Sequence, residues 1–190
     1  MSKQCKLSWV VVLWAALSPE AALAQSTGAG QARTVTQVVV GMIDSIEKQI
    51  TGIAEEMPAE KYGFAPTQGA FRGVRDFAEQ IKHAAAVHHL VAGTMLNERI
   101  TADMSDERGP DSVKSKTEVL AYLRDSFAAL RRAAATVNER NAFEPTKGPF
   151  GSAPTTRLEM IVLAVSHTSN HYGQVVEYLR MNGIVPPRTQ

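Results

Sequence analysis

The chain has 190 residues, of which 44% are hydrophobic and 21% are charged, with 20 Lys and Arg residues against 19 Asp and Glu residues. These values are ordinary for a globular protein, and the length suffices for one domain around a single core. A nearly neutral chain lacks the basic surface that binds a phosphate backbone, so we expect no nucleic-acid partner.

Residues 1–24 have the pattern of a secretory signal peptide. Lys3 and Lys6 precede the uncharged apolar run LSWVVVLWAAL, and the small residues Ala22 and Ala24 follow with the spacing of a cleavage site. We predict cleavage after Ala24 and a periplasmic or secreted mature protein. An uncleaved membrane anchor is the alternative, but a helix needs about 20 apolar residues to cross a bilayer, and this run is too short.

The predicted mature chain contains no cysteine and no tryptophan, because Cys5 and both tryptophans lie in the leader. It can therefore form neither a disulfide nor a thiolate metal site. Removal of the leader also removes two basic residues and one acidic residue, which leaves 18 of each. We expect residues 25–33 to be a flexible lead-in and residues 34–190 to form the folded domain, with no membrane span.

Three long helical patterns follow the lead-in. In the first, apolar residues recur at every third or fourth position up to about Glu56, as on one face of an α-helix. The same spacing of apolar residues predicts helices over residues 73–97 and 113–138. No segment shows the alternation typical of a β-strand, and the proline- and glycine-containing residues 138–154 are predicted to be a loop.

A fourth helix has the clearest boundaries. Thr155 or Thr156 can cap its start, with Glu159 available to complete a capping box, and Asn182 and Gly183 end it. Four such helices predict an all-α fold, a four-helix bundle. Short connections favour antiparallel neighbours, and the longer segments before the second and fourth helices are expected to close over one end of the bundle.

Histidines are the residues best suited to chemistry. His167 and His171 lie four positions apart in the fourth helix and so share one of its faces. Two imidazoles placed in this way can belong to a polar network or bind a divalent metal. A third ligand must come from another helix, and His83 falls within the apolar register of the second. His88 and His89 are turned away by more than about 100°, so we expect them at the surface or flank.

Two familiar metal-site patterns are not supported. Thr168 occupies the position at which a zinc protease helix carries its glutamate base. A carboxylate-bridged diiron site needs Glu-x-x-His, and Glu79 is one residue too far from His83. The spacing alone leaves both a hydrogen-bonded core network and a three-histidine metal site open.

Two segments resemble signatures of the DinB/YfiT-like proteins. The first, MPAEKYGFAPTQGAFRGVRDFAEQIKHAA, resembles the family's Pro-x-Glu-x-Tyr-x-Phe-x-Pro-Thr segment, which leads into a helix with one histidine. The second, SHTSNHYGQVVEYLRMNGIVPP, resembles its His-x-x-x-His signature, which is followed by Gly-Gln, Tyr-Leu-Arg and terminal prolines. Tyr172 departs from the pattern, because many members have arginine at that position.

The resemblance implies an up-down-down-up bundle, often a homodimer, in which His83, His167 and His171 bind zinc, nickel, iron or manganese. That topology needs a long crossover connection, such as the loop before the third helix, which the connection lengths do not predict. For the topology we therefore rely on the resemblance and not on the connection lengths. The family's activities imply a metal-dependent hydrolase with a small-molecule substrate, or a thiol transferase. An open metal position would lower the pKa of a bound water to about 7 or bind a thiolate. Export argues against the transferase, because the usual thiol cofactors stay in the cytosol.

The general base is not identified by the sequence. Glu79, one turn before His83, could orient that histidine, and Tyr62, Asn170 and Gln174 are other polar candidates near the site. A non-catalytic metal-binding or purely structural dimeric bundle is the alternative to an enzyme. A third hypothesis is a bundle that binds haem or a hydrophobic ligand, and only the histidines support it.

Overall fold

The four helices expected from the sequence are present in the computed structural model. Their bounds are Val35–Glu56 for α1, Phe77–Leu96 for α2, Lys116–Ala134 for α3 and Arg157–Met181 for α4, and the short 3-10 helix η2 spans Ala59–Lys61.

The structure describes residues 32–69, 71–99 and 108–187, apart from the side chains of residues 152 and 153. The predicted signal peptide (1–24) and most of the predicted lead-in (25–33) lie outside these residues. Residues Arg33–Gln190 form one compact unit. Within the described ranges, no helix is both long enough and apolar enough to span a bilayer.

A reciprocal capping box opens each of the four α-helices and determines where it starts. In α2, the Asp76 carboxylate accepts the backbone N–H of Glu79, and the Glu79 carboxylate accepts the backbone N–H of Asp76. The predicted box of Thr156 and Glu159 is confirmed in α4. Helices α2 and α3 start later than the apolar period predicts, because Asp76 and Ser115 are their caps. Each cap stabilises its helix by about 1 kcal/mol.

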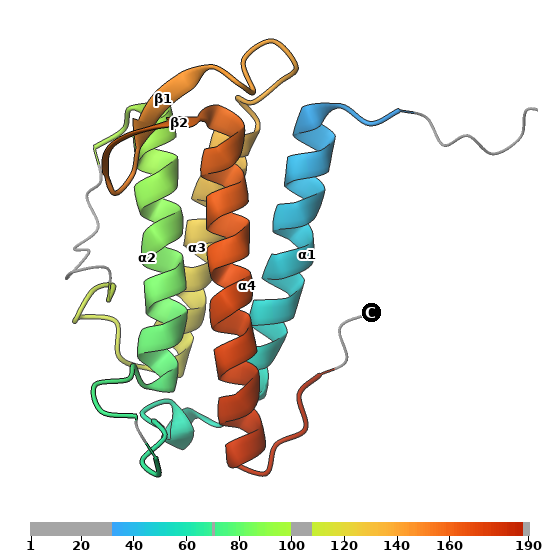
Figure 1. The fold of residues 1–190 in the computed structure, drawn as a ribbon. Helices are drawn as coiled ribbons and strands as arrows, with labels where there is room; N and C mark the ends of the chain where they lie inside the picture. The colour runs from blue at the N-terminus through green and yellow to red at the C-terminus, as the bar shows by residue number, and fades with distance from the viewer. Residues whose placement is uncertain (1–31, 70, 100–107, 188–190) are drawn as a thin grey trace, which may run out of the picture. The chain divides into compact units, whose positions relative to one another are not determined.

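Contacts at the helix ends establish the topology. Lys116 Nζ, at the start of α3, donates to the carbonyls of Glu55 and Met57 at the end of α1. The Tyr178 hydroxyl, near the end of α4, donates to the carbonyl of Arg75 just before α2. Helices α1 and α4 run in one direction and α2 and α3 in the other, the up-down-down-up order (Figure 1). The chain between α2 and α3 therefore joins opposite ends of the bundle, and the antiparallel order expected from connection lengths is wrong for this pair.

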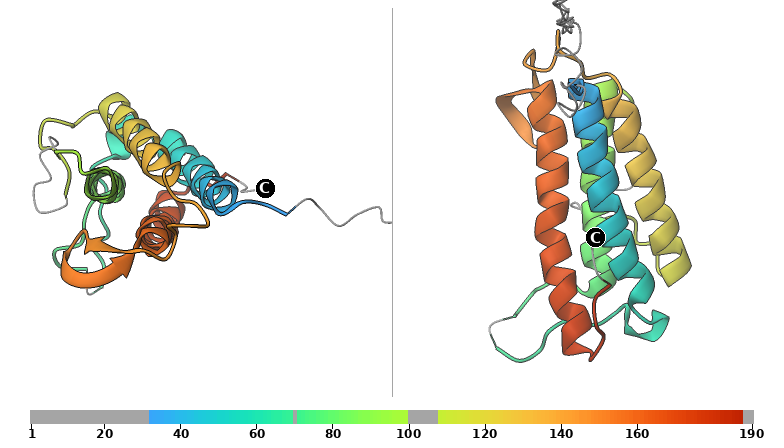
Figure 2. Two further views of the ribbon diagram at one scale, coloured as in Figure 1. Left: turned by 90° about the horizontal axis from the view of Figure 1, so that it is seen from above. Right: turned by 90° about the vertical axis from the view of Figure 1, so that its right-hand side faces the viewer.

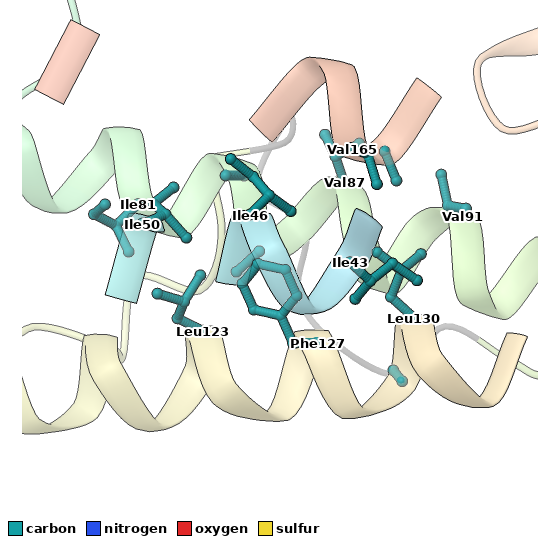
Figure 3. Close-up of a cluster of buried hydrophobic side chains, with 14 of the residues drawn as sticks. Ile43, Ile46, Ile50, Ile81, Val87, Val91, Leu123, Phe127, Leu130 and Val165 are labelled. Carbon is teal, nitrogen blue, oxygen red and sulfur yellow. The ribbon is translucent and has the colours of Figure 1, made fainter. Parts of the chain in front are cut away.

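Each helix packs against two neighbours, in the circular order α1, α3, α2, α4 (Figure 2). Isoleucine, valine, leucine and phenylalanine side chains fill the space between them (Figure 3). Ile50 of α1, Ile81 of α2 and Phe127 of α3 are completely shielded from solvent. Burial of apolar surface contributes about 25 cal/mol per Å², so this core is what holds α2 against α4.

A two-stranded antiparallel sheet precedes α4, where the sequence analysis expects only a loop. Strand β1 (Pro145–Gly148) pairs with β2 (Gly151–Thr156), with Pro145 opposite Thr156. Proline and glycine interrupt both strands, so no alternating pattern marks them. The hairpin lies at the end of the bundle where α1 begins, whereas residues 57–69 and 71–76 lie at the other end (Figure 1). The expectation that both long segments close over one end is therefore wrong.

Candidate metal centre

Three histidines from two antiparallel helices converge to form the histidine cluster, His83, His167 and His171. His83 lies in the second turn of α2, and the other two lie one turn apart in α4. The Nε2 atoms of His83 and His167 are 3.1 Å apart, and those of His167 and His171 are 3.2 Å apart. His83 and His171 are 5% and 7% exposed, whereas His167 is half-buried. The cluster is therefore most accessible at His167.

Gln80 determines which nitrogen of His171 carries the proton. Its Nε2 donates to Gln174 Oε1 at 3.0 Å, and its Oε1 lies 2.6 Å from His171 Nδ1. Since an amide oxygen only accepts, His171 Nδ1 must donate. In the neutral ring, His171 Nε2 then carries a lone pair, which faces His167.

The cluster environment favours neutral imidazoles. Burial, followed by the neighbouring His83 and by Arg75, lowers the pKa of His167 to about 4. Burial, followed by His167, His83 and Arg75, lowers the pKa of His171 to about 3. Both rings are therefore unprotonated at neutral pH, the form in which imidazole binds a metal.

The spacing of the ring nitrogens fits a metal ion. One ligand nitrogen from each histidine lies within 4.8 Å of the others. A tetrahedral metal with nitrogen ligands at about 2.0–2.1 Å holds those nitrogens about 3.3 Å apart, close to the observed 3.1 and 3.2 Å. A neutral His167 has one N–H and cannot donate to both neighbours, while its Nδ1 is buried without a partner. A shared cation would satisfy the converging nitrogens together.

An amide chain continues outward from His171. Gln80, which is 2% exposed, connects His171 to Gln174. Gln174 Nε2 in turn donates to Asn170 Oδ1 at 3.0 Å. Two of the polar residues considered from the sequence, Gln174 and Asn170, thus lie outside the ligand set. Gln80 is not among the residues predicted from the sequence, although its position three residues before His83 places it on the same helix face.

The remaining two polar candidates have structural roles. The Glu79 carboxylate, considered from the sequence as a residue that could orient His83, accepts the backbone N–H of Asp76 at the cap of α2. The Tyr62 hydroxyl donates to the Ala54 carbonyl at 2.6 Å, and its ring packs edge-on against Phe77. Burial raises the pKa of the Tyr62 hydroxyl above its ordinary value. Tyr62 therefore anchors the segment after α1 to the core.

His88 lies in the core, which contradicts the surface or flank position expected from the sequence. It is 0% exposed, with Nδ1 3.1 Å from Ser126 Oγ and Nε2 2.7 Å from Thr168 Oγ1. The angle between His83 and His88 around α2 does not predict the burial of His88, because α3 and α4 both pack against α2. His89, half-buried and 3.8 Å from Asp125, does lie at the flank.

A hollow of about 340 Å³ opens near the end of α4. Two aromatic side chains lie between this hollow and the cluster. Phe64, which lines the hollow, packs edge-on against Tyr178, whose hydroxyl is 3.5 Å from Nε2 of Gln80, the residue that contacts His171. No histidine lines the hollow, which has room for part of a small molecule. Its lining residues are Phe64, Pro66, Thr67, Gln68, Phe71 and Met181.

Known proteins share this sequence pattern and fold. Residues 42–175 match the DinB superfamily. A DinB-like protein from Bacillus cereus has a TM-score of 0.65 at 12% identity, over 83% of this chain and 99% of that one. A conserved protein from Enterococcus faecalis has a TM-score of 0.62 at 17% identity, over 78% of this chain and 97% of that one. These identities establish likeness of fold alone, and no curated protein is significantly similar.

The superfamily match covers more than half of the chain. It contains all three histidines of the cluster, on the two helices that bring them together. The agreement of sequence, fold and histidine placement leads to one conclusion: this chain belongs to the DinB superfamily.

Proposed function

We propose that His83, His167 and His171 bind a divalent metal ion. The observation that carries the proposal is the convergence of their Nε2 atoms, at 3.1 and 3.2 Å, around His167, whose single N–H in the neutral ring cannot bridge both contacts. Neutral imidazole suits zinc, nickel and iron and, less strongly, manganese, and these are the metals to test.

We further propose that the protein is a metal-dependent hydrolase of a small molecule. Three protein ligands leave a tetrahedral metal one position for water or substrate, as in catalytic zinc sites. A metal held there supplies Lewis-acid activation of water. The chain's own contribution is to keep the rings neutral by burial, to orient His171 through Gln80, and to leave access at His167.

A metal-binding bundle without catalytic activity is the second candidate. It is favoured by the composition of the cluster, which within the described residues contains histidines and no carboxylate. Glu79 is used in a helix cap, and the Tyr62 hydroxyl is bonded to a backbone carbonyl. A thiol transferase would need an external thiol, because residues 25–190 contain no cysteine.

We propose in addition that the protein is exported and forms a homodimer. The lysines, apolar run and small residues of segment 1–24 support export. Exposed apolar side chains on the neighbouring helices α1 and α4, among them Val38, Met42 and Val162, offer a surface for a second copy. A mature N-terminus at Gln25 in an exported fraction, and a solution mass of two chains by light scattering, are the expected results. A cytosolic full-length monomer would reject both proposals.

Elemental analysis of the purified mature protein tests the metal site. We expect about one divalent metal per chain, lost in His167→Ala and His171→Ala. His89→Ala is the matched control, because it removes a half-buried histidine outside the cluster. A wild-type protein that takes up none of the four metals, or a His167→Ala variant that retains one, would reject the site.

A substrate panel tests the hydrolase. Metal-loaded and chelator-treated protein are compared on esters, amides and phosphoesters, with His167→Ala as the negative control. Turnover that requires both the metal and His167 supports an enzyme. Stoichiometric metal with no turnover across the panel favours the non-catalytic bundle.

A further inference from the structure

Arg75 lies at the edge of the histidine cluster. It immediately precedes Asp76, the cap of α2, and its carbonyl accepts a hydrogen bond from the Tyr178 hydroxyl at 2.9 Å. The same hydroxyl is 3.5 Å from Gln80 Nε2, and Gln80 holds His171. The backbone at Arg75 is thus fixed to the residues that orient a ligand histidine.

The Arg75 side chain is half-buried, and among the described residues its Nε has no hydrogen-bond partner. That nitrogen is also shielded from solvent. None of the described carboxylates forms an ion pair with the Arg75 side chain. A charge withdrawn from water is costly unless it is paired, so an anion bound beside Arg75 would be stabilised there.

The composition of the cluster gives a second argument for an anion. The cluster supplies no negative charge to balance a bound cation, because its imidazoles are neutral and, within the described residues, it contains no carboxylate. The nearby carboxylates of Asp76 and Glu79 accept backbone N–H groups in the α2 cap. A divalent cation at the cluster would keep its full charge beside Arg75, and two cations repel unless an anion lies between them. A guanidinium binds carboxylate or phosphate through two parallel hydrogen bonds, which makes these the anions of choice.

We propose that Arg75 binds a carboxylate or phosphate group of the substrate, so that the site selects small anionic molecules. The proposal rests on the metal-dependent site argued above. The substrate carries a group that reaches the metal position and, a short distance away, an oxyanion that pairs with Arg75. Arg75 is therefore a specificity-determining residue, and its partner arrives with the substrate.

Hydroxamates test the proposal without turnover, because they chelate a metal through two oxygens. Acetohydroxamate is compared with the monohydroxamates of malonic, succinic and glutaric acid on cobalt-loaded protein, and the visible spectrum reports each Kd. We expect at least one acidic hydroxamate to bind about tenfold tighter than acetohydroxamate. Arg75→Gln should remove this preference and leave the Kd of acetohydroxamate unchanged.

Arg72→Gln is the matched control, because it removes the same charge from an exposed position in the same segment. It should keep the preference, and Arg75→Lys should keep part of it if Arg75→Gln fails to fold. If the protein takes up no cobalt, the metal site is rejected and this proposal with it; if cobalt binds but no hydroxamate alters its spectrum, the metal site stands and the role of Arg75 is overturned. If all the hydroxamates bind equally to the wild type, the metal site stands and the role of Arg75 is overturned. Phosphonate analogues complete the series, and the anion whose affinity depends more on Arg75 identifies the substrate class.

Discussion

Two side-chain groups each contain one histidine of α2, His83 or His88, and they differ in what the ring nitrogens face. In the His88 network (His88, Ser126, Thr168), each ring nitrogen faces a hydroxyl. In the histidine cluster, the Nε2 atoms face one another. A hydroxyl can donate or accept, whereas two imidazole lone pairs cannot satisfy each other. The first arrangement is complete among the described residues, and the second is the one that the proposed cation would complete.

The hydroxyls of the His88 network also serve their own helices. Ser126 Oγ donates to the Leu123 carbonyl at 2.7 Å, and Thr168 Oγ1 donates to the Ala164 carbonyl at 2.8 Å. A neutral His88 donates through one nitrogen and accepts through the other, so one hydroxyl turns from its helix carbonyl to the ring. Either choice leaves both nitrogens bonded, which suits a histidine whose role is to join α2, α3 and α4.

The largest expected difference between the histidine cluster and the His88 network is in the effect of added metal on the free energy of unfolding. Metal that binds the native state alone, at 100 to 1,000 times its Kd, raises the free energy of unfolding by about 3–4 kcal/mol. We expect this increase in the wild type and in His89→Ala, and none in His167→Ala, measured by urea unfolding with and without zinc. An equal increase in His167→Ala would place the metal elsewhere.

Substitution of His88 should have the opposite pattern. His88→Leu removes the ring partner of two buried hydroxyls, and we expect the free energy of unfolding to fall by about 2–3 kcal/mol. The increase caused by zinc should stay the same, because none of the cluster histidines is changed. Unaltered stability, or loss of the zinc effect, would remove the distinction between the two groups.

Acid should destabilise the metal-free protein in part through His88. Burial lowers the pKa of His88 to about 3, whereas an unfolded histidine titrates near about 6.5. Between these values the unfolded chain binds a proton that the native state excludes, so stability is full above pH 6.5 and decreases toward pH 3. The decrease approaches about 1.4 kcal/mol per pH unit for one histidine. Urea titrations from pH 7.5 to 5 should give a shallower slope for His88→Leu, and an unchanged slope would contradict the assignment.

The two groups were not equally predictable from the sequence. The four-residue spacing of His167 and His171 and the apolar register of His83 depend on a single helix each, so the ligand trio could be proposed in advance. The topology came from the family resemblance rather than from connection lengths. The position of His88 depends on which helices flank α2, and a helical wheel with one buried face does not contain that information.

The partners of the ligands were harder to predict than the ligands. Glu79 is a candidate from the sequence because it lies about one turn before His83, yet its place in the first turn of α2 makes it a cap residue. Gln80 takes the orienting role because the register between α2 and α4 places its amide between His171 and Gln174. That register is a property of the packed bundle, set by core side chains from both helices.

Substitution of Gln80 tests whether the cluster depends on this orientation. Gln80→Leu removes the acceptor for His171 Nδ1–H, and we expect zinc affinity to fall about tenfold or more, measured by competition with a chelator. Gln80→Glu keeps an acceptor at the same place and should bind zinc at least as tightly as the leucine variant does. Wild-type affinity in Gln80→Leu would mean that another contact fixes the proton of His171.

Removal of one hydroxyl from the His88 network should have the smallest effect. Thr168→Val keeps the shape of the side chain but removes the partner of His88 Nε2, and we expect a loss of about 1 kcal/mol in unfolding free energy. Zinc affinity should not change, although Thr168 directly follows His167, because the two side chains face different groups. The double variant with His88→Leu should lose less than the sum of the single losses, since both remove one contact. If Thr168→Val weakens zinc binding as well, α4 transmits a change in the His88 network to the ligands, and the two groups act as one.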